Sequence, residues 1–113
     1  MRRKEIDVAP EVYVQVAQQQ EYFRAKEPGE PGEALAKRFE EAVFSQISSL
    51  RTYPERGAFF RFRRHRREAL RWLSIAGFRR HLLFYHYNLT ERRVHVVNLR
   101  HSSMDIEAVL RED

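Results

Sequence analysis

Apolar positions follow a strand-like pattern most clearly in Arg80–Tyr87. Successive side chains of an extended chain point to opposite sides. The apolar residues of this run then form two sets, with Leu82 and Phe84 on one face and Leu83, Tyr85 and Tyr87 on the other. A strand that is apolar on both faces is typical of the centre of a sheet. We therefore predict that the rest of the chain packs around this strand.

Two helices are predicted before this central strand. Residues Arg3–Val8 suit a first strand, and Pro10 fits the first turn of a helix over Glu11–Ala25. The apolar stripe expected on that helix comprises Tyr13, Val16, Ala17, Gln20 and Phe23. Two Pro-Gly pairs in Lys26–Gly32 predict a turn. A second helix should begin near Glu33, where Leu35, Phe39, Val43, Ile47 and Leu50 recur at helical spacing. We expect an antiparallel hairpin that covers one sheet face.

The segment after the hairpin is ambiguous. Residues 54–57 have the composition of a turn, whereas Ala58–Glu68 is compatible with a short strand, a one-turn helix or an ordered loop. Its phenylalanines interleave with arginines, so they either stack on nucleic-acid bases or pin the loop to the core.

The C-terminal half predicts further strands. These run over residues 69–75 and 93–99, flanking the central strand, with turns at residues 76–77 and 88–92. In the last strand we expect Val94 and Val96 on one face and Val97 and Leu99 on the other. Asp105 is placed to cap a short helix over residues 106–111. The expected fold is α+β: an N-terminal strand, a helical hairpin, a three-stranded antiparallel sheet and a C-terminal helix.

Composition limits the class of protein. With 113 residues and 42% apolar content, we expect residues 1–113 to form a single domain. There is no apolar run of about 18 residues, no apolar segment typical of a secretion signal and no cysteine, so we expect a cytoplasmic protein without a membrane contact or disulfide. No metal-ligand spacing is recognisable, and we expect neither metal nor cofactor.

Charge is concentrated in one part of the chain. Ten arginines lie between Arg51 and Arg80 against Glu55 and Glu68, which is a local balance of +8 within a net charge of +5. Arginine suits phosphates, carboxylates and aromatic rings, so the patch favours an anionic partner such as nucleic acid, the ribosome or an acidic protein segment. A solvated surface loop is the alternative. A plain nucleic-acid-binding domain is a further alternative, although recognition-helix, zinc-finger and RNA-recognition patterns are absent from the sequence.

Several motifs in their order resemble one family. They are Leu50-x3-Pro54-x2-Gly57, Leu70-Arg71-Trp72-Leu73, Phe78-x2-His81-Leu82-Leu83-Phe84-Tyr85 and Leu99-x-His101-x2-Met104-Asp105-Ile106-Glu107. Together with the layout they resemble the RelE/ParE toxins of bacterial type II toxin–antitoxin systems, and more closely the ParE branch. Ser103 departs from the pattern, because family members often carry a basic residue there.

The resemblance implies a toxin that a cognate antitoxin neutralises. ParE-type toxins poison DNA gyrase, whereas RelE-type toxins cut mRNA in the ribosome, and the shared fold does not choose between them. RelE-like enzymes use a C-terminal tyrosine, which this chain lacks after Arg100. We therefore expect a gyrase inhibitor without covalent chemistry, with ribosome-dependent mRNA cleavage as the alternative. The state expected with antitoxin is a heterotetramer, or a toxin dimer on its own.

The resemblance also suggests site residues. For target binding we predict Arg71, Arg100, His101, Met104 and Asp105. For antitoxin contact we predict Tyr13, Phe23, Phe39, Arg63 and Arg64, together with the exposed sheet edge; core packing is the alternative for the aromatic residues. If the chain cuts RNA, the residues expected to supply proton transfer and phosphate charge are Arg71, Arg80, His81 and His101.

Overall fold

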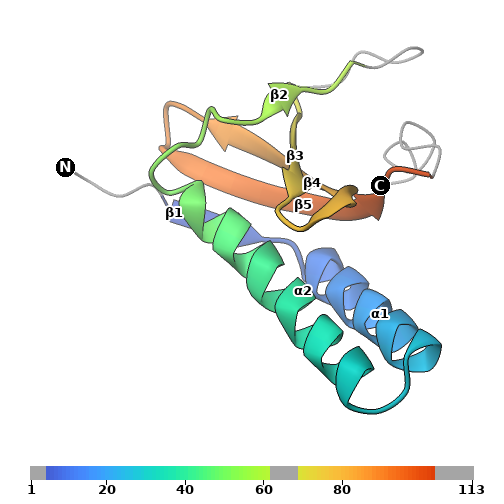
Figure 1. Ribbon diagram of the computed structural model, residues 1–113. Helices are drawn as coiled ribbons and strands as arrows, with labels where there is room; N and C mark the ends of the chain where they lie inside the picture. The colour runs from blue at the N-terminus through green and yellow to red at the C-terminus, as the bar shows by residue number, and fades with distance from the viewer. Residues whose placement is uncertain (1–4, 62–68, 104–113) are drawn as a thin grey trace.

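The computed structural model describes residues 5–61 and 69–103 of the chain. Within these ranges it contains two helices and five strands (Figure 1). In chain order they are β1 (Glu5–Val8), α1 (Pro10–Lys26), α2 (Glu30–Ser49), β2 (Ala58–Phe59), β3 (Arg71–Ile75), β4 (Phe78–Asn88) and β5 (Arg93–His101). The predicted C-terminal helix lies outside the described residues.

The strands form one mixed sheet in the order β1-β5-β4-β3-β2, which places β4 at the centre as its alternation predicts. Strands β3, β4 and β5 are the predicted antiparallel sheet. That prediction is incomplete, because β1 joins the same sheet in parallel to β5 and the two-residue β2 joins it antiparallel to β3. The ambiguous segment after the hairpin therefore begins as a very short edge strand.

The two helices form the predicted hairpin and lie together on one side of the sheet (Figure 1). Helix α2 begins at Glu30, earlier than predicted, because Pro31 occupies its first turn, where a missing N–H costs nothing. The second Pro-Gly pair is thus helical. A β-carbon at Gly32 would lie 2.0 Å from the Glu27 carbonyl oxygen, so only glycine permits this close approach.

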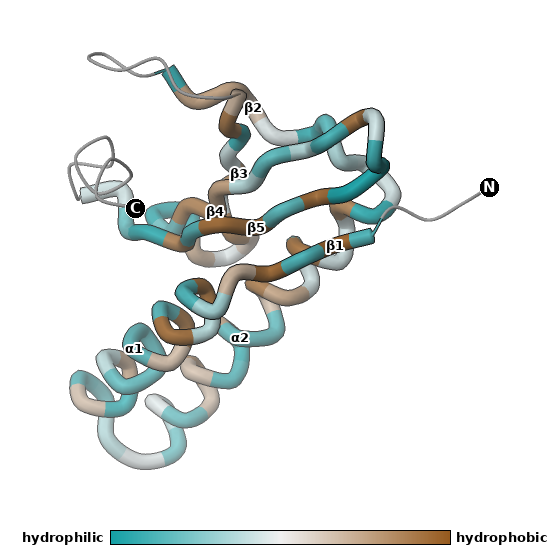
Figure 2. The backbone as a smooth tube through the Cα atoms, turned by 180° about the vertical axis from the view of Figure 1, so that it is seen from behind, coloured by the Kyte–Doolittle hydropathy of each residue, from teal (hydrophilic) through white to brown (hydrophobic). Residues whose placement is uncertain are grey.

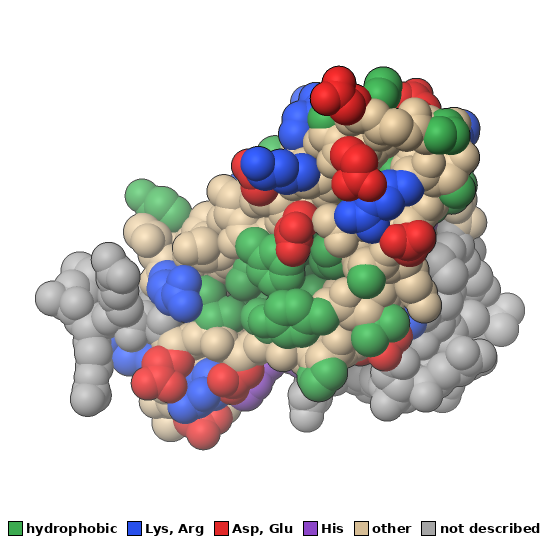
Figure 3. Space-filling model, turned by 90° about the horizontal axis from the view of Figure 1, so that it is seen from below, with side chains coloured by type: hydrophobic (Ala, Val, Ile, Leu, Met, Phe, Trp, Pro, Cys, Tyr) green, Lys and Arg blue, Asp and Glu red, His purple; other side chains and the backbone are tan. Residues whose placement is uncertain are grey.

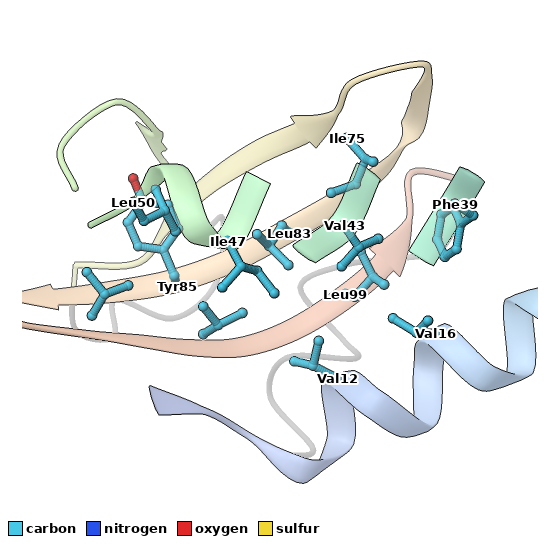
Figure 4. Close-up of a cluster of buried hydrophobic side chains, with 12 residues drawn as sticks. Val12, Val16, Phe39, Val43, Ile47, Leu50, Ile75, Leu83, Tyr85 and Leu99 are labelled. Atoms are coloured by element: carbon cyan, nitrogen blue, oxygen red, sulfur yellow. The ribbon is translucent and has the colours of Figure 1, made fainter. Parts of the chain in front are cut away.

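The main core lies between the hairpin and the sheet. Figure 4 shows valines of α1, the α2 stripe from Phe39 to Leu50 and inward residues of β3, β4 and β5 packed together. The α2 stripe is as predicted except that Ala36 is buried and Leu35 is only half-buried. Figure 2 shows the hydrophobic stretches of the strands side by side, whereas the far end of the hairpin is mostly hydrophilic.

The other sheet face carries a smaller cluster. Phe84 and Leu70 are buried there, packed by Phe60, Trp72, Leu82 and Val97. The division of β4 into a Leu82/Phe84 face and a Leu83/Tyr85 face is therefore confirmed. Phe60 packs on Phe84 with ring centroids 5.6 Å apart. For this phenylalanine, the interpretation as a residue that pins the loop to the core is right.

The predicted stripe of α1 is right at Val16 and Phe23, which pack in the main core, but wrong at Tyr13 and Ala17. Its buried residues are Val12, Gln15 and Val16, whereas Tyr13 is 53% exposed and Ala17 is exposed. Hydrophobicity alone misplaces the stripe because a glutamine lies in the middle of the buried face. A polar side chain can be buried there only if its hydrogen bonds are made within the protein.

An irregularity in β5 provides those hydrogen bonds. Phe84 pairs with Asn98 but the next residue, Tyr85, pairs with Val96, so β5 has one extra residue at this point. Val94, Val96 and Leu99 consequently all belong to the main core, which corrects the predicted face of Leu99. The Gln15 side-chain oxygen accepts the Leu99 N–H at 2.7 Å, and its amide donates to Asn98 Oδ1 at 2.8 Å.

Candidate functional site

Tyr85 fixes the segment that follows α2. Its buried hydroxyl donates to the Pro54 carbonyl oxygen at 2.8 Å and accepts from the Gly57 N–H at 2.8 Å. Tyr85 and Leu50 both belong to the main core and are labelled in Figure 4. A β-carbon at Gly57 would lie 2.6 Å from the Tyr85 hydroxyl oxygen, so the approach requires glycine. Burial raises the pKa of this hydroxyl, which therefore stays protonated and able to donate.

Arg71 holds the same segment from β3. Its Nη1 donates to the carbonyl oxygens of Glu55 at 3.0 Å and Gly57 at 2.8 Å. Its guanidinium group lies 4.0 Å above the centre of the Phe59 ring. We call Arg71, Tyr85 and the segment Pro54–Gly57 the loop bracket. The predicted target-binding arginine is thus engaged in hydrogen bonds to the backbone.

Two histidines are paired at the other end of β4. His81 lies opposite His101 across the β4–β5 ladder, and their ring centroids are 5.1 Å apart at right angles. His101 belongs to β5, which continues two residues beyond the strand predicted over residues 93–99. His81 is buried, and its Nε2 has no hydrogen-bond partner in the described part of the chain. Burial, followed by the charge of His101, lowers the pKa of His81 to about 4, so the ring is neutral at pH 7.

Ser103 orients His101. The Ser103 N–H donates to His101 Nδ1 at 3.1 Å, and the serine hydroxyl oxygen lies 2.7 Å from the same atom. Because Nδ1 accepts a hydrogen bond, a neutral His101 ring carries its proton on Nε2. The residue that departs from the family pattern therefore fixes the tautomer of the adjacent histidine.

The other predicted target-side residues are dispersed. Arg100 Nη2 lies 3.9 Å from Glu11 Oε1, so this side chain is directed to the start of α1. Arg80 is exposed, and its carbonyl oxygen accepts the Ser102 N–H at 2.6 Å. Met104 and Asp105 lie outside the described residues.

The candidate residues therefore form two groups. Arg71 pairs with Tyr85, which lies four residues along β4 from His81, or about 13 Å in a strand. The loop bracket and the histidine pair are separate features rather than one site. Among the described side chains, no group of three or more His, Cys, Asp or Glu residues is placed to hold a metal ion. None of the described helices is long and apolar enough to cross a membrane.

The predicted antitoxin residues differ in exposure. Tyr13 is exposed and stacks on Phe44 with ring centroids 5.5 Å apart, whereas Phe23 is half-buried against Phe39 and Phe78. Phe39 has no exposed surface, so its place is in the core and it offers no side-chain surface to a partner. Arg63 and Arg64 lie outside the described residues. Viewed from the helical side, hydrophobic side chains gather in a patch bordered by charged groups (Figure 3).

Sequence reasoning missed the loop bracket as a unit. Pro54 and Gly57 lie 31 and 28 residues from Tyr85 in the chain, so spacing alone does not connect them. The available signal was the motif Leu50-x3-Pro54-x2-Gly57 together with a tyrosine in an otherwise apolar strand, since a buried hydroxyl requires a partner.

The family comparison agrees with this architecture. The family model described as "ParE toxin of type II toxin-antitoxin system, parDE" matches residues 17–106, which is most of the chain and includes both groups of candidate residues. A search of curated proteins finds no match. Because the matched region extends from α1 to beyond β5, the chain belongs to the ParE toxin family and is the toxin of a type II toxin–antitoxin system.

Proposed function

We propose that this toxin inhibits DNA gyrase by binding it, without a cofactor and without covalent chemistry of its own. In this proposal gyrase is held with its DNA cleaved, and the cognate antitoxin prevents the contact. The target-binding surface includes His101 and Arg100 at one end of the sheet. At the other end, the loop bracket contributes through the segment that it holds.

The observation that supports a binding mechanism is the environment of Arg71. An arginine that stabilises a scissile phosphate must direct its N–H groups at that phosphate. Here Nη1 is directed at two backbone carbonyl oxygens and the guanidinium plane covers Phe59. This arrangement suits a residue that shapes a protein surface.

His81 supports the same conclusion. RNA cleavage through the 2′-hydroxyl requires a general acid that is protonated near neutral pH. With a pKa of about 4, only roughly one His81 side chain in a thousand is protonated at pH 7. His81 is therefore poorly suited to donate a proton to a leaving group.

Ribosome-dependent mRNA cleavage is the second candidate function. The observation that favours it is the contact between His81 and the half-buried His101, which brings two imidazole rings together at one end of the sheet. In that mechanism the imidazolium form of His101 would be the general acid and neutral His81 the base.

Two assays run side by side separate the candidates. Purified toxin is added to gyrase with supercoiled plasmid and to a translating extract in which mRNA ends are mapped. Linear plasmid with intact mRNA supports gyrase inhibition. Cuts at codon positions with normal supercoiling would contradict it and assign the chain to the mRNA-cleaving class. Addition of the antitoxin should abolish whichever activity is found.

A further inference from the structure

An open pocket of about 530 Å³ is formed in part by the segment that the loop bracket holds. It is lined by five consecutive residues after α2 and by one residue of β4, namely Thr52, Tyr53, Pro54, Glu55, Arg56 and Tyr87. Tyr53 is 66% exposed, an unusual position for a large aromatic ring. We call this feature the Tyr53 pocket.

The backbone of the segment that lines the pocket is held in place by hydrogen bonds. The N–H groups of Thr52 and Tyr53 donate to the Ser49 carbonyl oxygen at 3.2 and 3.0 Å. Behind them, Tyr85 and Arg71 hold the carbonyl oxygens of Pro54, Glu55 and Gly57. A binding surface that is already ordered loses little conformational entropy when a partner docks. The loop bracket therefore has the role of a support for this pocket.

The pocket lining contains one acidic and one basic residue, Glu55 and Arg56, and they form no ion pair with each other. Arg56 Nη1 donates to the Ser49 hydroxyl at 2.7 Å, and nearby Arg51 Nη1 to the Ser48 hydroxyl at 3.4 Å. These are neutral acceptors. By contrast, Arg24 and Arg93 each form ion pairs with two carboxylates. In the described part of the chain, no carboxylate lies within 4.0 Å of the Arg51 or Arg56 side-chain nitrogens, so their charge remains available to a partner.

We infer that the Tyr53 pocket is an anchor site for the protein target: it receives an apolar side chain from a gyrase loop, and Arg56 pairs with a carboxylate next to that side chain. This inference rests on the proposed gyrase function. Tyrosine and arginine are the residue types that most often dominate the energy of a protein interface, and an exposed tyrosine beside an arginine without an acidic partner matches that composition.

Of the residues predicted for antitoxin contact, those that the structure describes lie on the helical hairpin. Tyr13 stacks on Phe44 of α2 and belongs to the hairpin, whereas the Tyr53 pocket is formed after α2 ends. Variants of the pocket should therefore separate binding of the target from binding of the antitoxin.

The test measures the affinity of purified full-length toxin for immobilised gyrase and, separately, for its antitoxin. Tyr53→Ala and Arg56→Glu should each weaken gyrase binding at least about tenfold and leave antitoxin affinity within about twofold. Arg56→Lys keeps the charge and should retain most of the binding. The matched controls are Tyr22→Ala, another exposed tyrosine, and Arg38→Glu, another exposed arginine, and both should leave gyrase binding unchanged.

Each other outcome overturns the inference in a distinct way. If the wild-type toxin does not bind gyrase, the proposed function itself fails, which is evident before any variant is compared. If the wild-type toxin binds and the pocket variants bind equally well while retaining the wild-type melting temperature, only the pocket assignment fails. A loss of antitoxin affinity with unchanged gyrase affinity would assign the pocket to the antitoxin.

Discussion

The two ends of β4 bury the same kind of group with opposite results. Tyr85 and His81 are polar aromatic residues on the helix-facing side of one strand, and both are largely removed from water. The Tyr85 hydroxyl both donates and accepts a hydrogen bond, whereas His81 Nε2 has no partner among the described residues. Burial therefore stabilises a defined loop at one end and creates a site sensitive to protonation at the other.

The two buried polar groups of β4 therefore have different effects on stability. A satisfied buried polar group specifies one geometry, and here that geometry supports the Tyr53 pocket. An unsatisfied one costs free energy that the surrounding packing must offset. The predictions below test that contrast, beginning with the packing common to both ends.

The largest loss of stability is expected from a substitution in the middle of β4. Phe84 has no exposed surface and packs on the face opposite the helices. Phe84→Ala should lower the free energy of unfolding by about 3–5 kcal/mol, because it removes a buried ring and leaves a cavity. Chemical denaturation of the two proteins measures the difference. A loss below about 1 kcal/mol would show that this face does not contribute a core.

Acid should lower the free energy of unfolding through protonation of His81. The pKa of His81 is lowered from 6.5 to about 4, so between these pH values the unfolded chain binds a proton that the folded chain does not. Stability should therefore fall as the pH decreases from 6.5 towards 4, by about 3 kcal/mol from this residue, and its contribution should be constant below that range. Denaturation curves across this pH range measure the effect.

The control for this pH dependence is His81→Phe, which should remove that component of the acid sensitivity. His101, the titratable residue that faces His81 across the strands, remains in this variant. An unchanged pH profile would mean that the loss of stability comes from other groups.

Most of the fold could be predicted from the sequence, and the parts that could not have identifiable causes. The alternation in β4 and the period of α2 are strong because one face of each is continuously apolar. The α1 stripe was wrong at Tyr13 and Ala17 because Gln15 is buried, and the predicted face of Leu99 was wrong because β5 contains an extra residue. Both errors depend on contacts between distant residues, which a local pattern does not contain.

The candidate site was harder to predict from the sequence for the same reason. His81 and His101 were both named as candidates, but their pairing depends on the extension of β5 to His101. The role of Arg71 was not predicted, because its acceptors are backbone oxygens of a loop 14 and 16 residues earlier. A family motif can mark such a residue, but only its contacts distinguish direct target binding from support of a neighbouring surface.

Substitutions at the two ends of β4 should differ in their effect on stability. Tyr85→Phe leaves the Gly57 N–H and the Pro54 carbonyl oxygen without their buried partner and should cost about 2–3 kcal/mol. At pH 7, His81→Phe removes the unpartnered Nε2 together with one interaction with the Phe78 backbone, and these opposing effects should change stability by less than about 1 kcal/mol. Thermal unfolding of both variants tests the contrast, and equal losses would contradict it.

The smallest stability change should accompany a clear functional one. Arg71→Ala removes two hydrogen bonds and a contact with Phe59, and we expect a cost of about 1–2 kcal/mol with the fold retained. Growth arrest in an inducible bacterial host should weaken, because the loop that forms the Tyr53 pocket loses its support.

A second readout distinguishes this role from general destabilisation. If Arg71 positions the pocket, Arg71→Ala should reduce gyrase affinity while antitoxin affinity is maintained, whereas a global loss of stability would reduce both. Arg71→Lys should not restore gyrase affinity fully, because an ammonium group lacks the planar face that stacks on the Phe59 ring. Arg24→Ala is the matched control, since that arginine forms ion pairs with Glu21 and Glu33 on the hairpin, away from the pocket. Growth arrest by Arg71→Ala at the wild-type level would show that the loop bracket supports the fold alone.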